Sequence, residues 1–122
     1  MILGLGNDIV EISRIEKAIS NERFLKRVYT EKEIEIIEKK GNRAASYAGR
    51  FSAKEAVSKA MGTGVRDFAL TDIEILNDEL GKPYIVFKNG LKEKMKDIQA
   101  ELSISHSREY ATAVVLLLKK ER

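Results

Sequence analysis

The segment RFSAKEAVSKAMGTG, residues 50–64, restricts the fold of this chain more than any other stretch. Alanine is the strongest helix former, and alanines from residue 44 onward extend the same pattern to the glycines at 62 and 64. We therefore predict one long helix, packed closely at the centre of the fold. That helix also carries charged side chains that need partners if they are buried: Arg50, Lys54, Glu55 and Lys59.

The residues before this helix predict one strand and then shorter helices. Residues 2–10 are mostly apolar with two glycines, and we expect their strand to end near Asp8 and a helix to start around Glu11. A second helical piece follows Ser20, and a third helix covers TEKEIEIIEKKG. The end signals of that third helix are a capping box, Thr30 with Glu33, and a C-cap, Gly41.

The residues after the long helix predict two hairpins. LTDIEIL and YIVF alternate as strands around a turn cluster, and NGLKEKMKDIQ forms a short amphipathic helix capped by Asn89. AELSISHS and EYATAVVLLLK pair around Ser107 and Arg108. Helices early and strands late indicate an α+β fold, with an antiparallel sheet packed against the long central helix. At 122 residues we expect a single domain, residues 1–122.

Composition excludes several classes of protein. The chain has no cysteine, which excludes disulfides, zinc–thiolate sites and thiol nucleophiles. The first ten residues lack a basic leader and are interrupted by Asp8, so we do not interpret them as a signal peptide. The run AVVLLL is far shorter than the roughly 18 residues that a membrane span needs. We expect a soluble, cytoplasmic protein without a membrane partner.

The net charge of +3 is small, so the distribution of charge along the chain is more informative about binding partners. Residues 14–27 hold Arg14, Lys17, Arg23, Lys26 and Arg27 against only two glutamates. This segment is a candidate surface for an acidic partner.

Asp8 allows two interpretations. It closes an apolar strand, where a buried carboxylate needs a hydrogen-bond donor, a cation or a metal. It also precedes an expected helix by a few residues, and on this residue alone an N-cap is the better interpretation.

The charges of the long helix also allow two interpretations. Glu55 and Lys59 are four residues apart, and a surface ion pair at that spacing adds only about 0.3–0.5 kcal/mol. Small neighbouring residues would instead leave room for a ligand. Arg50 and Lys54 form a separate cationic stripe, and the backbone amides of residues 62–64 can receive phosphate oxygens, although such a turn is usually only a helix terminator.

Taken together, these polar residues point to phosphate chemistry. His106 is the only histidine, and it lies among serines and Arg108 at a strand end that can hold an anion. Asp8 and Glu55 are the two carboxylates that Mg²⁺ needs when it takes its other oxygens from water and substrate phosphates. No strongly nucleophilic side chain is evident, which suits phosphoryl transfer.

Five motifs carry a resemblance to a known family. GLGNDIVEISRIEKA, RFLKRVYTEKE, AGRFSAKEAVSKAMGTG, GKPY and SISHSREYATAVV resemble the holo-acyl-carrier-protein synthases, in the same order and over nearly the whole chain. These are the bacterial short-chain 4'-phosphopantetheinyl transferases. The resemblance implies transfer of 4'-phosphopantetheine from coenzyme A to a serine of apo acyl carrier protein, with Mg²⁺, for fatty acid biosynthesis. Adenosine 3',5'-bisphosphate would be released.

The resemblance also implies roles for individual residues. Asp8 and Glu55 match the Mg²⁺ ligands, and Lys59 matches the lysine beside the phosphates. Arg50 and His106 match positions that approach the nucleotide and its 3'-phosphate. The remaining matches for coenzyme A binding are Lys54, Gly62, Gly64 and Pro83.

The basic segment and the assembly follow from the same resemblance. Arg14 matches an arginine that meets the acidic recognition helix of the carrier protein, with Arg23, Phe24 and Arg27 beside it. Similar enzymes are homotrimers with active sites between neighbouring subunits, so the named residues need not share a pocket within one chain. Tyr29 departs from the pattern, since a more apolar residue is expected there.

Two other classes of function remain as alternatives. A metal-dependent hydrolase acting on nucleotides would use the same carboxylates and cations, but it would not need the basic segment around Arg14. A nucleic-acid module would interleave cations with stacking aromatics, and an aromatic content of 7% without tryptophan gives that little support. We therefore expect no nucleic-acid partner.

Overall fold

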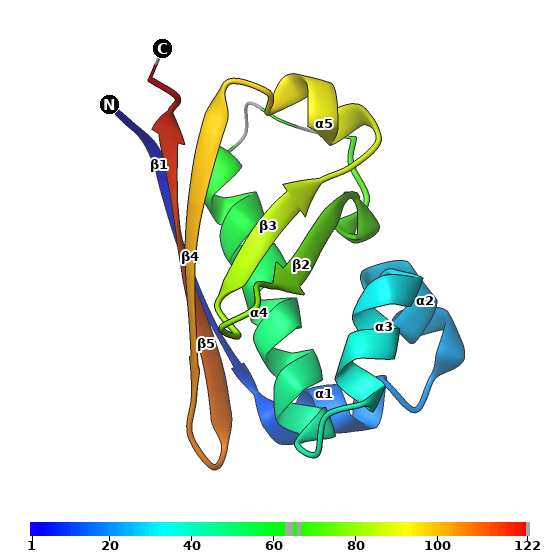
Figure 1. Ribbon diagram of the computed structural model, residues 1–122. Coiled ribbons are helices and arrows are strands. Elements are labelled where there is room, and N and C mark those ends of the chain that lie inside the picture. The colour runs from blue at the N-terminus through cyan, green and yellow to red at the C-terminus, as the bar shows by residue number, and fades with distance from the viewer. Residues whose placement is uncertain (63–64, 66, 122) are drawn as a thin grey trace.

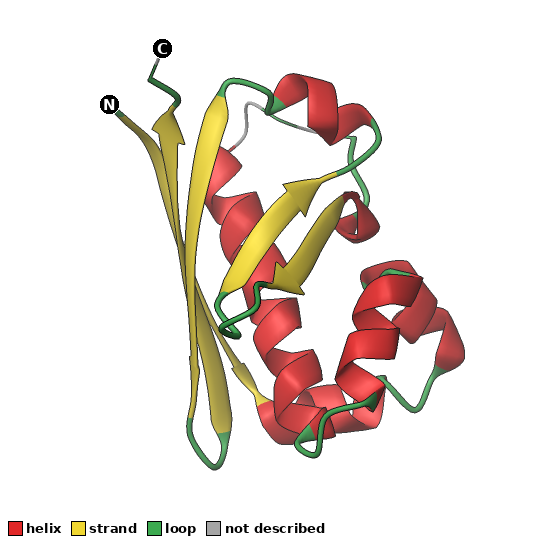
Figure 2. Ribbon diagram, in the orientation of Figure 1, coloured by secondary structure: helices red, strands yellow, loops and turns green. Residues whose placement is uncertain are grey.

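The computed structural model describes residues 1–62, 65 and 67–121 of the chain. Helix α4 (Arg43–Met61) runs through the middle of the fold and packs on a three-stranded sheet, and a two-stranded sheet lies across the helix with β3 beside β4 (Figure 1). The remaining helices lie around the two ends of α4 (Figure 2). The predicted class, α+β with antiparallel sheets around a long central helix, is confirmed. None of the described helices is long and apolar enough to cross a membrane.

The three-stranded sheet consists of β1 (Ile2–Glu11), β4 (Ile98–His106) and β5 (Tyr110–Lys119). The order is β1-β5-β4 and both pairings are antiparallel, so β1 and β4 are the two edges. The predicted hairpin around Ser107 and Arg108 is confirmed, because β4 and β5 flank these residues. Alternation turns Val10, Leu102 and Val115 inward, where they are buried.

Strand β1 is longer than the sequence predicted. It pairs with β5 as far as Glu11 opposite Tyr110, and α1 (Ile12–Ala18) begins only there, with Glu11 at its N-cap. Asp8 lies inside the strand opposite Ala113. The prediction that the strand ends near Asp8 is therefore wrong, and so is the N-cap interpretation of Asp8, because cross-strand pairing continues past it.

Two glycines bring β1 into contact with the backbone of α4. A Cβ at Gly6 would lie 1.8 Å from the carbonyl oxygen of Ala56, and one at Gly4 would lie 2.0 Å from that of Ala60. Any side chain at these positions would push the strand away from the helix. The spacing between β1 and α4, which carry the candidate carboxylates, thus depends on these glycines.

The smaller sheet is the predicted hairpin of β2 (Ile73–Asn77) and β3 (Pro83–Phe87). Residues Leu70–Asp72, expected as the start of its first strand, form the 3₁₀ turn η2 instead. Helix α5 (Gly90–Lys94) follows, but it is shorter than the helix expected over NGLKEKMKDIQ, because Ile98 and Gln99 belong to β4. Asn89 holds its N-cap position without capping it, because the Asn89 side chain donates to Asp72 Oδ1 at 2.7 Å.

Helices α2 (Glu22–Val28) and α3 (Glu31–Glu38) lie beside the end of α4 that is nearer α1 (Figure 1). The capping box of Thr30 and Glu33 is confirmed. The expected C-cap at Gly41 is wrong by two residues, since α3 ends at Glu38 with Lys39 as its cap.

Tyr29, the residue for which a more apolar side chain was expected, is buried between α2 and α4. Its hydroxyl donates to the carbonyl of Tyr47 at 2.7 Å, and the two rings meet edge to face with centroids 4.9 Å apart. Burial, followed by the charge of Glu33, raises the pKa of Tyr29 far above its usual value. A polar atom is tolerated here because it is hydrogen-bonded.

Candidate functional site

The first cluster of candidate residues joins β1 to α4. Lys59 Nζ donates to Asp8 Oδ1 at 2.9 Å and to the carbonyl of Asn7 at 3.0 Å. The carbonyl of Asp8 accepts the hydroxyl of Ser52 from α4 at 3.0 Å and that of Thr112 from β5 at 2.8 Å. Only 13% of the Asp8 side chain is exposed. Donors from two elements, α4 and β5, therefore hold the main chain and the carboxylate of this residue in place.

Glu55 completes this cluster one helical turn before Lys59. The carboxyl is half-buried, and its pKa is raised first by burial and then by the charge of Asp8, while Lys59 opposes the shift. Two carboxylates from different elements thus lie within electrostatic range of each other. Among the described residues Lys59 has an ion pair with Asp8 and none with Glu55, so the surface-pair interpretation of Glu55 and Lys59 is wrong.

The donor set of this cluster suits a hard divalent cation. Asp8 and Glu55 supply carboxylate oxygens, the ligands that Mg²⁺ prefers. Within residues 1–62, 65 and 67–121 no group of three or more His, Cys, Asp or Glu side chains could hold a metal ion. A cation at Asp8 and Glu55 would therefore take its remaining ligands from water or from a substrate that carries phosphate.

The second cluster lines a pocket of about 280 Å³ between α4, the β2–β3 turn and the end of β4. This pocket brings together three predicted coenzyme A contacts, Arg50, Pro83 and His106. Arg50 is almost fully buried, its Nε donates to the carbonyl of Ile75 at 3.3 Å, and its guanidinium also donates to Asn77 Oδ1. A guanidinium and an imidazole in one pocket suit an anionic ligand.

Sequence reasoning missed Lys40, which lines the same pocket. Burial, and then the neighbouring charge of Arg50, lower the pKa of Lys40. Two cations in one small pocket repel each other unless an anion lies between them. No local signal marks this lysine, because it follows the end of α3 in an ordinary charged stretch and meets Arg50 only through the tertiary fold.

The two clusters lie on opposite sides of α4. At 100° per residue, Glu55 and Lys59 are rotated by about 140° and 180° from Arg50 around the helix axis. Asp8 lies on edge strand β1, whereas His106 ends the opposite edge strand, β4. Within a single chain the two clusters therefore do not form one continuous site.

Lys54, also predicted to contact coenzyme A, lies in neither cluster. The side chain is fully buried, and its ammonium donates to Glu33 Oε1 at 2.8 Å and to the carbonyls of Leu70 and Ile73 at 3.0 and 2.6 Å. All three ammonium hydrogens are used. We therefore assign Lys54 to the interior of the fold rather than to the coenzyme A site.

The remaining residues predicted to bind coenzyme A, Gly62 and Gly64, come at the end of α4 in the sequence. Gly62 ends α4 with a φ of 65°, a conformation that favours glycine. Gly64, with Thr63, lies outside the described residues.

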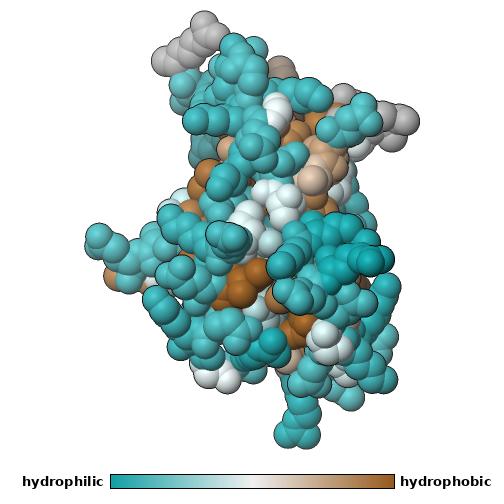
Figure 3. Space-filling model, turned by 90° about the vertical axis from the view of Figure 1, so that its right-hand side faces the viewer, coloured by the Kyte–Doolittle hydropathy of each residue, from teal (hydrophilic) through white to brown (hydrophobic). Residues whose placement is uncertain are grey.

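The predicted partner surface lies on α1 and α2. Arg14, Arg23 and Arg27 are exposed, and none has an ion pair within the described part of the chain. Phe24 is half-buried, with its ring centroid 6.0 Å from that of Phe51. Phe51 precedes Glu55 by one turn of α4, so α2 packs close to the carboxylate cluster. Hydrophilic side chains cover most of this side of the molecule, with apolar groups visible between them (Figure 3).

Comparisons with known proteins agree on one family. Residues 4–115 match the profile of the 4'-phosphopantetheinyl transferase superfamily. A holo-[acyl-carrier-protein] synthase of Fusobacterium nucleatum is 62% identical over 122 residues, covering 97% of this chain and 100% of the relative. A Bacillus anthracis holo-(acyl-carrier-protein) synthase in complex with CoA (3',5'-ADP) superposes with a TM-score of 0.82 and 42% identity, covering 98% and 99% of the two chains. The Helicobacter pylori holo-[acyl-carrier-protein] synthase, in complex with coenzyme A, gives 0.81 and 38%, covering 93% and 99%.

Proposed function

Because this chain belongs to the 4'-phosphopantetheinyl transferase superfamily, as one of its holo-acyl-carrier-protein synthases, we propose that it transfers 4'-phosphopantetheine from coenzyme A to acyl carrier protein. The hydroxyl oxygen of a carrier serine forms a bond to the phosphorus nearer the pantetheine. The bond from that phosphorus to the bridging oxygen breaks, adenosine 3',5'-bisphosphate leaves with that oxygen, and the proton of the serine hydroxyl is released. We assign this activity to a single domain, residues 1–122.

The cluster of Asp8, Glu55 and Lys59 is the observation that carries this proposal. Asp8 and Glu55 would hold Mg²⁺, and the ion would supply positive charge to offset the negative charge of the pyrophosphate. Lys59 holds the Asp8 carboxylate at 2.9 Å and offers its partly exposed ammonium to a phosphate oxygen. The hydroxyls of Ser52 and Thr112 fix the main chain of Asp8, so little reorganisation is needed when substrate arrives.

The pocket on the other side of α4 would bind the nucleotide end of coenzyme A. Arg50, His106 and Lys40 supply the donors that a 3'-phosphate requires, and Pro83 forms part of the wall beside the adenine. Gly62 shapes the turn at the end of α4, and we extend that role to Gly64.

The acidic helix of the carrier would dock on α1 and α2. Arg14, Arg23 and Arg27 would attract it, and the half-buried Phe24 would offer apolar contact area. The contact between Phe24 and Phe51 supports this location, because it brings the docking surface within one helical turn of Glu55.

A ring of three chains would join the two clusters. The outer face of the three-stranded sheet carries exposed apolar side chains, with Leu5 and Ile9 at 65% and 64% exposure and Val114 beside them. The carboxylate cluster lies at the β1 edge and the anion pocket at the β4 edge, so a head-to-tail ring brings one of each together. Light scattering should give three times the mass of the chain.

An exposed apolar residue outside the sheet provides the control for this assembly. Leu5→Asp should give an inactive monomer, whereas Leu80→Asp, on the β2–β3 turn, should leave the assembly intact. An active wild-type monomer at assay concentration would refute the shared site.

Mass spectrometry of the carrier tests the reaction itself. Apo acyl carrier protein should gain one phosphopantetheine when coenzyme A and Mg²⁺ are both present, and none in EDTA. Unchanged carrier mass with folded enzyme would refute the proposal. Hydrolysis of coenzyme A at full rate without carrier would instead indicate a nucleotide hydrolase.

A further inference from the structure

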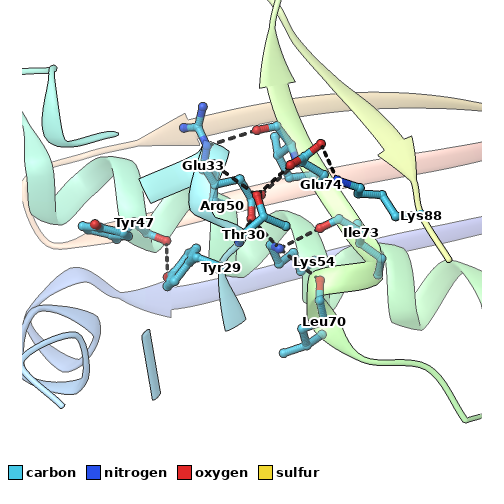
Figure 4. A network of polar contacts seen from close by, with 11 residues as sticks. Tyr29, Thr30, Glu33, Tyr47, Arg50, Lys54, Leu70, Ile73, Glu74 and Lys88 are labelled. Atoms are coloured by element: carbon cyan, nitrogen blue, oxygen red, sulfur yellow. Dashed lines mark hydrogen bonds and ion pairs between the residues drawn. The ribbon is translucent and has the colours of Figure 1, made fainter. Parts of the chain in front are cut away.

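A buried polar network joins the start of α3 to α4 and β2 (Figure 4). Its centre is the ion pair of Glu33 and Lys54, both without exposed surface, and none of the described buried side chains in it lacks a hydrogen-bond partner. Such a pair is costly to desolvate, and an apolar pair of similar volume is often at least as stable. A role in positioning therefore accounts for the pair better than stability does.

The Glu33 carboxylate accepts hydrogen bonds from three elements. Oε1 accepts from Lys54 Nζ and from the amide of Thr30, both at 2.8 Å, and Oε2 accepts from the amide of Ile75 on β2 at 2.8 Å. Because these donors come from α4, from the junction of α2 and α3, and from β2, the carboxylate fixes these elements relative to one another.

Ile75 links Glu33 to the anion pocket. Its amide donates to Glu33, and its carbonyl accepts from Arg50 Nε at 3.3 Å. Burial lowers the pKa of Arg50, and the charge of Glu33 opposes this shift, so the carboxylate also acts on the guanidinium through space. A chain of hydrogen bonds through Ile75, together with this charge interaction, thus connects Glu33 to the orientation of Arg50.

We propose that Glu33 is a positioning residue for Arg50: it fixes β2 at Ile75 and supplies the negative charge that holds the guanidinium in the coenzyme A pocket. This inference rests on the proposed function. Glu33 lines no part of the pocket and has no exposed surface, so it acts on the nucleotide only through Arg50.

Calorimetric binding of adenosine 3',5'-bisphosphate to the protein tests this inference without requiring transfer. Glu33→Gln should weaken binding about tenfold, within the coupling found for neighbours in one network. Glu35→Gln, the same change at an exposed position of α3, should leave binding unchanged. Arg50→Gln should also weaken binding, and Glu33→Gln should then add nothing further, because both act through one guanidinium.

A second variant separates positioning from loss of stability. Glu33→Gln alone leaves Lys54 buried without an anion, whereas Glu33→Gln with Lys54→Met buries no unpaired charge and should recover thermal stability. The affinity should stay about tenfold low in this double variant, because Arg50 still lacks its anionic neighbour. In turnover, KM for coenzyme A should rise while KM for the carrier does not.

The outcomes distinguish failure of the positioning role of Glu33 from failure of the proposed coenzyme A site. Normal affinity in Glu33→Gln, additive losses with Arg50→Gln, or recovery of affinity together with stability would overturn the positioning role alone. No binding of the bisphosphate by the wild-type protein would overturn the proposed coenzyme A site and this inference with it.

Discussion

Gly6→Ala should damage stability and activity together, because Gly6 sets the distance between β1 and α4. The new Cβ would lie 1.8 Å from the carbonyl oxygen of Ala56, so strand or helix has to move by roughly 1 Å to reach even a tight contact. Overpacking of this kind costs about 1–3 kcal/mol, and the entropy that alanine removes from the unfolded chain returns about 0.4–1 kcal/mol at most. We expect a net loss of about 1–2 kcal/mol.

The effect on activity follows from the position of Asp8, two residues along the same strand. A displacement of about 1 Å between catalytic groups can cost roughly 100-fold in rate. Urea unfolding should report the loss of stability, and the mass assay of the carrier should report a fall in kcat/KM of that order at saturating Mg²⁺. Excess Mg²⁺ should not rescue the rate, because the geometry rather than the affinity is changed.

Gly41→Ala is the matched control for Gly6→Ala. Nothing lies within 4 Å of a Cβ at Gly41, so alanine there should be neutral or slightly stabilising and should leave transfer unchanged. Wild-type stability and turnover in Gly6→Ala would refute the argument that this glycine sets the distance between the strand and the helix.

Three further predictions concern individual side chains. Glu55→Gln removes one of two neighbouring like charges, so thermal stability in EDTA should be unchanged or raised. The kcat/KM measured with excess Mg²⁺ should collapse, and near-normal turnover would contradict a metal role. Arg14→Glu should raise KM for the carrier far more than KM for coenzyme A. Lys94→Glu, the same charge change on α5, should alter neither KM. Equal effects of Arg14→Glu on both substrates would exclude a docking role. Tyr29→Phe should lower the free energy of unfolding in urea by about 1 kcal/mol, because the hydrogen bond to the Tyr47 carbonyl is lost, and transfer should be unchanged. An unchanged free energy of unfolding would mean that this buried hydrogen bond makes no net contribution to stability.

Local patterns in the sequence were enough to predict most of the elements. The capping box of Thr30 and Glu33, the long alanine-rich helix and both hairpins depend on residues close together in the chain, so their signals survive without tertiary information. The motifs GLGNDIVEISRIEKA and AGRFSAKEAVSKAMGTG likewise singled out Asp8 and Glu55, through their resemblance to the family.

The tertiary structure alone decided which charged residues meet. Lys59 pairs with Asp8, 51 positions away, rather than with Glu55 on its own helix, and Lys54 pairs with Glu33 in the interior. The same holds for β1, which runs past Asp8 because its partner strand lies near the other end of the chain. Sequence spacing specifies neighbours within one helix or strand, but the partner of a long charged side chain depends on which elements pack against it. The sequence therefore determined the elements and the candidate residues, whereas the packing of β1 and β2 on α4 determined what each charge contacts.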